Sequence, residues 1–204
     1  MAKQVTKFAV LTVVIIGLLG AATYFRPNPM TKQQLKALNE ILSARITGEQ
    51  VETIKLPDKT ARKFPAVNKM FKVAADKEKS YALTVSPVGY RAPINLMVVI
   101  DAKKNEVMGI KVIQHNETSG YGNSLTETWF VNRFKGKAVD KYLQRVVLEA
   151  KDDNDIIQIT GATVSTQAVI NGVNSAMGIY RETVLGEKAE PVPLKVEGYV
   201  TATE

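Results

Sequence analysis

The sequence contains no cysteine and a single histidine, His115. The absence of thiols excludes disulfides, zinc-thiolate sites, iron-sulfur ligation and thiol-attached haem. One histidine cannot build a histidine-rich metal site, and it restricts any Ser-His-Asp triad to that one residue. We therefore expect no metal site and no self-contained hydrolytic site, and any redox chemistry requires a non-metallic group.

The chain also lacks the arrangement of charge that marks a nucleic-acid-binding protein. Its formal net charge is +7, but the basic residues are thinly spread, with clusters only at 59–79 and 133–137. No aromatic-studded basic motif accompanies them, so we expect no nucleic-acid partner. With 204 residues, of which 45% are hydrophobic and 23% charged, the chain has the composition of one folded domain plus an appendage.

Residues 8–25 form an apolar run without a charge, between Lys7 and Arg26. At a rise of about 1.5 Å per residue, a helix of this length nearly spans a hydrocarbon core of about 30 Å. We expect residues 1–26 to be a single-pass membrane anchor that places the remaining chain on the extracytoplasmic side of the cell membrane. A cleaved signal peptide is the main alternative, because residues 20–22 are small enough for a cleavage site, and a buried helix is the third.

Residues 27–80 are expected to form a helical stalk and connector. Pro27 and Pro29 favour a short stiff linker, after which Thr31 is a suitable N-cap. Apolar residues then recur at helical spacing, and Gly48 suggests the end of that helix. Residues 57–79 are rich in lysine with little periodicity, and we expect them to be mostly irregular.

Residues 81–187 have the pattern of an α+β domain with a mostly antiparallel sheet and packed helices. Three branched, strand-like runs begin at Tyr81, and the second and third predict an antiparallel hairpin. Residues 142–150 fit either a strand or a helix. A later helix is expected to start with Ser165 as N-cap and to stop at Gly186, and residues 188–204 are expected to be a loosely ordered tail.

The run ITGATVSTQAV places several hydroxyl groups where this last helix is expected to begin. Unpaired N–H groups and the positive end of the helix dipole favour a phosphate at such a place. Simple helix capping explains the same residues, and the spacing of a Walker A loop is absent. The hydroxyl groups belong to Thr160, Thr163, Ser165 and Thr166, around Gly161 and Ala162.

A second unusual stretch, HNETSGYG at residues 115–122, follows a strong strand-like run. Functional residues are frequent in such glycine-punctuated loops. A plain surface turn is the alternative, and residues 116–118 also fit a glycosylation sequon.

The order of these segments resembles a known family. An N-terminal anchor, GYRAPINLMVVID, HNETSGYG, the segment from Trp129 to Lys137 and finally TGATVST follow one another as in the flavin-bearing G subunit of the Rnf electron-transport complex. The C subunit of the sodium-pumping NADH:quinone reductase is similar. The resemblance covers roughly residues 80 to 185, which marks residues 81–187 as an FMN-binding domain.

This resemblance implies that Thr163 carries FMN covalently through a phosphodiester. A separate flavin transferase takes that FMN from FAD, so no catalytic residue is expected in this chain. The family's ETPGLG loop differs here, with Ser119 for proline and Tyr121 for leucine. The implied phosphate surroundings are Thr160, Gly161, Ala162, Ser165 and Thr166, and the implied flavin neighbours are Glu117, Thr118, Gly120 and Tyr121, with Gly89 and Tyr90 as weaker candidates.

The function implied is that of an electron-transfer subunit in a membrane ion-translocating ferredoxin:NAD oxidoreductase (Rnf) complex. Its expected partners are the other subunits, the flavin transferase and membrane lipid, and it is a redox relay more than a stand-alone enzyme. Two alternatives remain open, namely a membrane-tethered scaffold without redox function and a flavoprotein reductase or regulator outside any respiratory complex.

Overall fold

The computed structural model describes residues 29–75, 78–120 and 122–191. The expected membrane anchor and most of the expected tail lie outside these residues. Within the described residues, no helix is long and apolar enough to cross a membrane.

A five-stranded antiparallel sheet forms the centre of the fold, and its strands follow one another in sequence order. The pairing of β4 with β5 is antiparallel, so the expected hairpin is confirmed. In the turn between them, Asp101 Oδ1 accepts hydrogen bonds from the N–H groups of Lys103 at 2.7 Å and Lys104 at 3.2 Å. The strands are β1 (Val51–Ile54), β2 (Val67–Ala75), β3 (Glu78–Val85), β4 (Asn95–Asp101) and β5 (Glu106–Gln114).

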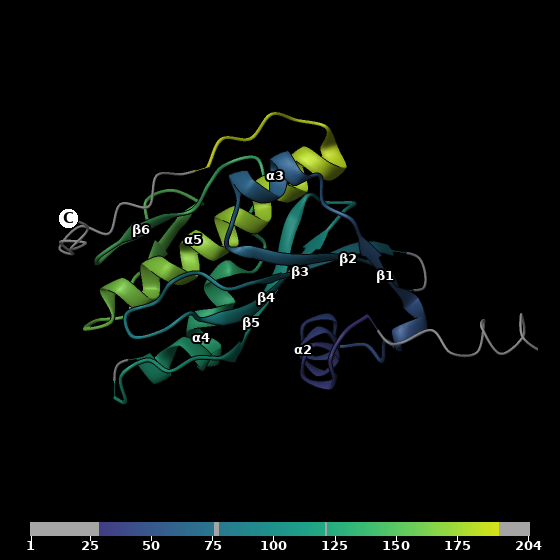
Figure 1. Cartoon of the computed structure of the whole chain (residues 1–204). Coiled ribbons are helices and arrows are strands. Elements are labelled where there is room, and N and C mark those ends of the chain that lie inside the picture. The colour runs from purple at the N-terminus through teal and green to yellow at the C-terminus, as the bar shows by residue number, and fades with distance from the viewer. Residues whose placement is uncertain (1–28, 76–77, 121, 192–204) are drawn as a thin grey trace, which may run out of the picture.

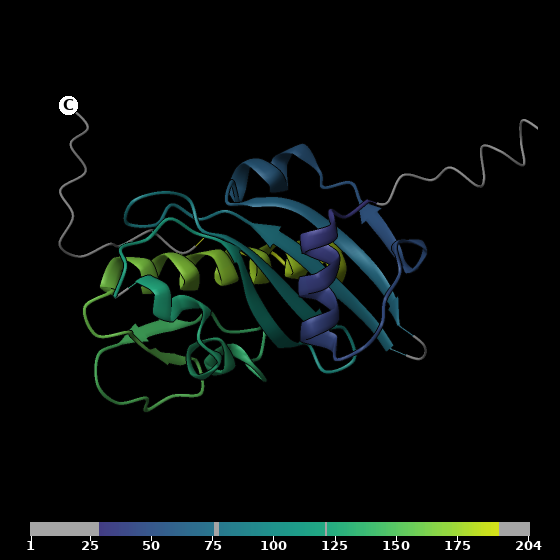
Figure 2. The same ribbon diagram turned by 90° about the horizontal axis from the view of Figure 1, so that it is seen from below.

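Helices cover both faces of this sheet, as Figures 1 and 2 show from two directions. The long helix α5 (Thr163–Tyr180) lies on one face and α2 (Lys32–Leu42) on the other. Strand β4 is therefore buried on both sides, and its side chains alternate between two apolar clusters. Val98 belongs to the cluster under α5, whereas Val99 belongs to the cluster under α2.

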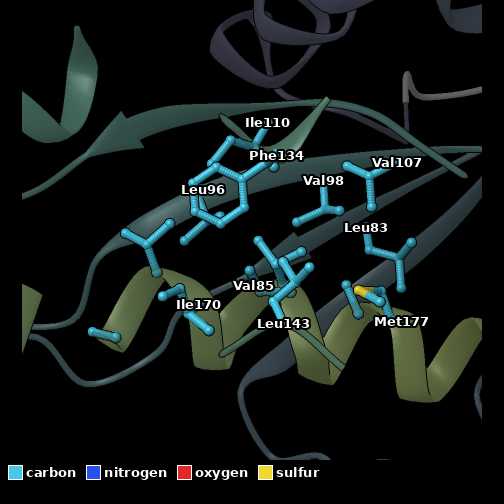
Figure 3. Close-up of a cluster of buried hydrophobic side chains, with 14 of the residues drawn as sticks. Leu83, Val85, Leu96, Val98, Val107, Ile110, Phe134, Leu143, Ile170 and Met177 are labelled. Carbon is cyan, nitrogen blue, oxygen red and sulfur yellow. The ribbon is translucent and has the colours of Figure 1, made fainter. Parts of the chain in front are cut away.

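The larger cluster fills the space between the sheet and α5 (Figure 3). Ile170 and Met177 of α5 belong to this cluster, and Met177 lies beside Leu83 of the sheet. Phe134 lies beside Ile110 in the same cluster and is fully buried. This packing fixes the axis of α5 against the sheet.

Helix α2 starts as expected but ends earlier. Thr31 caps it through a reciprocal pair of hydrogen bonds with Gln34. The expected end at Gly48 is wrong, because Ser43 adopts a left-handed conformation with φ 51°. The Asn39 side chain then bonds both backbone groups of Ile46 and turns the chain toward the sheet.

The expectation of irregular structure over residues 57–79 is wrong. This stretch contains the helix α3 (Asp58–Lys63) and the strand β2, which pairs with β3 along its whole length. Its lysines are interleaved with apolar side chains such as Met70 and Phe71, both fully buried. The sheet thus continues across the boundary that we expected at residue 80.

The segment between β5 and α5 consists of short elements. Two of them, β6 (Gln144–Val146) and β7 (Asp155–Ile157), form a small parallel sheet, so the undecided run at 142–150 contains a strand. After α5, a π-helical turn at Arg181–Leu185 ends at Gly186, which has φ 70° as the expected stop. The remaining elements are η1 (Gly48–Gln50), η2 (Gly122–Thr126), α4 (Thr128–Val131) and η3 (Asn132–Phe134).

Candidate functional site

Helix α5 begins at Thr163, two residues before the Ser165 that we expected to precede it as N-cap. The cap position is held by Ala162, whose N–H donates to the carbonyl of Ile159 at 3.0 Å. Gly161 makes the turn with φ 80°, a left-handed conformation that glycine adopts without strain. Ser165 therefore lies inside the first helical turn.

The start of α5 leaves backbone donors available. An α-helix cannot pair its first N–H groups internally, and here these belong to residues 163–165. Alanine has no side-chain acceptor, and within the described residues no side chain caps this end of α5. The helix has 18 residues, so the positive end of its dipole adds to the attraction for an anion.

A cavity of about 370 Å³ opens at this end of the helix. Ligand pockets range from roughly 300 to 1,000 Å³, so this volume is within the range of small-molecule sites. Three separate segments form its walls, namely the loop after β3, the loop after β5 and the start of α5. The lining residues are Tyr90, Thr118, Gly122, Gly161, Ala162, Thr163, Val164 and Ser165.

The four candidate hydroxyl groups differ in environment. Thr166 is fully buried, and its Oγ1 accepts a hydrogen bond from the Ile159 N–H at 3.1 Å. The Ser165 hydroxyl donates a hydrogen bond to the Glu117 carboxylate. Thr160 is exposed and does not line the cavity, whereas Thr163 is half-buried and does. Among the described residues, Thr163 thus offers a cavity hydroxyl that no other contact engages.

Glu117 lies behind the cavity wall and is only 6% exposed. Its carboxylate accepts hydrogen bonds from the N–H groups of Tyr90 and Arg91, each at 3.0 Å, and from the Ser165 hydroxyl. Burial raises the pKa of Glu117, but the bonds from Ser165 and from the backbone outweigh it, so the pKa is lowered below 4.5. The carboxylate is ionised at neutral pH and is not itself a lining group.

The loop after β5 places its residues unequally. Thr118 lines the cavity, but Gly120, with φ 90°, does not. Tyr121 lies outside the described residues. Gly122 belongs to the lining although we did not expect it to, and its small size is required because a Cβ there would lie 2.2 Å from the Cβ of Glu117.

Three further residues complete the comparison with the sequence. Tyr90, a weaker candidate, lines the cavity with a side chain 52% exposed. Val164 also lines the cavity, and in the sequence only its position next to Thr163 indicated that it would. His115 lies outside the lining, and its Nδ1 accepts the Glu117 N–H at 3.3 Å. Across residues 29–75, 78–120 and 122–191, no group of three His, Asp or Glu side chains could hold a metal.

Comparison with known proteins finds a described domain that matches the segment holding this site. A model of the FMN-binding domain matches residues 89–178, a range that contains every residue lining the cavity. The G subunit of the ion-translocating oxidoreductase complex of Shewanella loihica is 34% identical over 111 residues, which are 52% of each chain. The alignment thus spans about half the length of that relative.

A longer alignment and a solved structure extend these matches. The G subunit of the proton-translocating ferredoxin:NAD(+) oxidoreductase complex of Clostridium ljungdahlii is 29% identical over 177 residues, 85% of this chain and 88% of that one. The crystal structure of the C subunit of the Na(+)-translocating NADH-quinone reductase from Parabacteroides distasonis has a TM-score of 0.54 at 16% identity, covering 72% of this chain and 90% of that one, and so shows a shared fold. Residues 89–178 therefore match the FMN-binding domain, and the chain is similar to the G subunits of ion-translocating oxidoreductase complexes.

Proposed function

We propose that the chain is an electron-transfer subunit of an ion-translocating ferredoxin:NAD oxidoreductase complex and carries FMN covalently on Thr163. The observation that carries this proposal is the Thr163 hydroxyl, which lines a cavity at an uncapped helix start. The names of relatives aligned over most of their length support the complex. The FMN-binding model supports the cofactor.

The residues present suit a flavin mononucleotide. The N–H groups at the start of α5 suit its phosphate, since each is a donor at the positive end of a helix dipole. Tyr90 and Thr118, from the other two segments of the cavity wall, supply an aromatic side chain and a hydroxyl for the remaining part of the group. When bound, the flavin supplies the electron transfer, and the chain supplies position and surroundings.

Thr163 is proposed to become attached by group transfer from FAD. Its Oγ1 forms a bond to the phosphorus of the FMN half, and the phosphoanhydride bond to the AMP half breaks. AMP leaves with the electron pair, and the hydroxyl proton passes to a base of the flavin transferase. The only histidine, His115, is bonded within its own loop, which favours an external enzyme for this activation.

The proposed place of the chain is the extracytoplasmic side of a membrane. We propose residues 1–26 as a single-pass anchor in lipid, 27–80 as stalk and connector, 81–187 as the FMN-binding domain and 188–204 as a tail. The pairing of β2 with β3 argues that the sheet-forming part of the connector packs with the domain. The other subunits of the complex and the transferase are its proposed partners.

One experiment tests the covalent site. The full chain is coexpressed with a flavin transferase, and the denatured protein is examined for flavin fluorescence and by intact mass. We expect a mass increase of one FMN minus one water, lost in Thr163→Val and kept in Thr160→Val. An unlabelled wild-type chain, or a label that persists in Thr163→Val, contradicts the proposal.

A second experiment tests the place in a complex. The chain is isolated from its native membranes in mild detergent, and co-purifying proteins are identified by mass spectrometry. We expect integral membrane subunits of an oxidoreductase in constant ratio to the chain. A flavin-labelled chain that is extracted from the membrane without co-purifying subunits indicates a reductase or regulator instead.

A further inference from the structure

The carboxylate of Glu117 joins the three segments that form the cavity. The residue belongs to the loop after β5, which supplies Thr118 and Gly122 to the wall. Its Oε1 accepts the N–H of Arg91 and its Oε2 accepts the N–H of Tyr90, both in the loop after β3. Its third hydrogen bond comes from Ser165 in the first turn of α5. Glu117 is thus part of one segment of the cavity wall and is hydrogen-bonded to the other two.

The backbone around this carboxylate approaches closely. A Cβ added at Gly89 would lie 2.7 Å from Glu117 Oε1, and one added at Gly122 would lie 2.2 Å from Glu117 Cβ. Both distances are shorter than van der Waals contact, so glycine at these two positions lets the loops close around the side chain. The position of Glu117 is therefore fixed by packing as well as by hydrogen bonds.

The bond to Ser165 has a consequence for chemistry. Ser165 lines the same cavity as Thr163 and carries a primary hydroxyl, a less hindered acceptor than the secondary hydroxyl of threonine. This hydroxyl donates a hydrogen bond to the carboxylate of Glu117, a residue that is 6% exposed, and hydrogen bonds to ionised groups are about twice as strong as neutral ones. The Ser165 oxygen is thus oriented toward Glu117, whereas the Thr163 oxygen has no such partner.

We propose that Glu117 is a positioning and specificity-determining residue for FMN attachment: it holds the three segments of the cavity wall together and keeps the Ser165 hydroxyl turned toward itself, so that Thr163 accepts the group in preference to Ser165. This inference rests on the proposed function, because it concerns the same transfer from FAD. It assigns Glu117 a role behind the cavity wall in place of a direct flavin contact. Loss of its charge should slow the transfer and also redirect part of it.

The test uses the full-length chain, purified in detergent without FMN and then incubated with flavin transferase and FAD. Glu117→Gln keeps the size of the side chain but places an amide donor among three donors. We expect transfer at least about tenfold slower than in the wild type, a change of about 1.4 kcal/mol, because the amide cannot accept all three hydrogen bonds and the segments of the cavity wall lose their shared contact. Peptide mapping by tandem mass spectrometry should find part of the label on Ser165.

Glu182→Gln is the matched control, since Glu182 also has a hydrogen-bonded carboxylate but lies at the other end of α5, paired with Lys63 at 2.6 Å. We expect it to label at the wild-type rate on Thr163, and circular dichroism confirms that both variants are folded. A folded Glu117→Gln that labels Thr163 alone at the wild-type rate overturns the inference, as does equal slowing in Glu182→Gln. An unlabelled wild-type chain would overturn the proposed function instead, so the two failures are distinguishable.

Discussion

The hydroxyl of Ser165 donates a hydrogen bond to the carboxylate of Glu117, which lies 48 residues earlier in the sequence. This contact joins the loop after β5 to the first turn of α5, next to Thr163. Serine often caps helices, but here the Ser165 hydroxyl is bonded to Glu117. The backbone N–H groups at the start of α5 therefore stay available. The contact makes the stability of the site depend on the charge of a single carboxylate.

The first prediction concerns pH. The pKa of Glu117 in the folded chain lies below 4.5, the value for the unfolded chain. Its stabilising contribution is therefore present above pH 4.5 and is lost as the pH falls from there through the lower folded-state pKa. Glu117→Gln should lower the free energy of unfolding by about 1–3 kcal/mol at neutral pH, and this difference should narrow on acidification.

Urea unfolding of both proteins between pH 7 and pH 3 measures this difference. The control is Glu149→Gln, a change at a residue that is exposed, which should leave the free energy of unfolding within about 0.5 kcal/mol of the wild type. A gap between wild type and Glu117→Gln that stays constant down to the lowest pH would contradict the prediction.

The second prediction concerns the glycine beside Glu117. In Gly122→Ala the new methyl group would lie 2.2 Å from the Glu117 Cβ, so the loop must move. Overpacking of this kind costs about 1–3 kcal/mol, and we expect both a lower melting temperature and weaker FMN attachment. In the control Gly109→Ala, the methyl group meets only the Ile41 side chain, at 3.2 Å, and attachment should be unchanged. Equal labelling of the two variants would argue against a shared cavity wall at Gly122.

Local sequence patterns predicted a large part of this site. The hydroxyl-rich run around Thr163 was placed at a helix start because Thr, Gly and Ser there differ from the periodic apolar residues that follow. The helix begins three residues earlier than expected, and the expected capping residue Ser165 is hydrogen-bonded to a distant carboxylate instead. No local pattern reveals that contact, because it depends on how the loops after β3 and β5 fold together.

The strands of the sheet also differ in how far local sequence reveals them. The β4–β5 hairpin was visible because both strands are apolar and lie next to each other in the sequence. Strand β2 was not recognised, since Lys69 and Lys72 dilute its apolar pattern and mask the buried Met70 and Phe71. Its strand character depends on the neighbours β1 and β3, which a short window of sequence does not contain.

The third prediction separates the two faces of the sheet. Leu38 of α2 is fully buried on the face opposite α5, and Leu38→Ala should lower the free energy of unfolding by about 2–5 kcal/mol. FMN attachment per folded molecule should not change, because the cavity lies at the start of α5. Leu148→Ala is the control, since that side chain is 87% exposed and its loss should have little effect on stability. Loss of attachment in folded Leu38→Ala would show that α2 contributes to the site.

The fourth prediction concerns the far end of α5, where the Tyr180 hydroxyl donates a hydrogen bond of 2.6 Å to Asn105 Oδ1. Asn105 has φ 54° in the turn between β4 and β5, so this bond ties the helix to the hairpin. Burial chiefly raises the pKa of Tyr180 to about 12, with smaller contributions from Tyr81 and Asp101. The contribution of Tyr180 to stability is therefore fully present below pH 10, the pKa of tyrosine in the unfolded chain. It declines as the pH rises toward 12.

Tyr180→Phe removes this hydrogen bond and leaves the Asn105 oxygen without its donor. We expect a loss of about 1 kcal/mol in the free energy of unfolding at pH 7, and a smaller decline of stability than in the wild type between pH 10 and pH 12. Tyr81→Phe is the matched control, because Tyr81 meets the Tyr180 ring edge to face at 5.5 Å and its change keeps both rings and the bond to Asn105. Chemical unfolding monitored by circular dichroism measures all three proteins. If Tyr180→Phe is as stable as Tyr81→Phe at neutral pH, the hydrogen bond to Asn105 does not hold α5 to the hairpin.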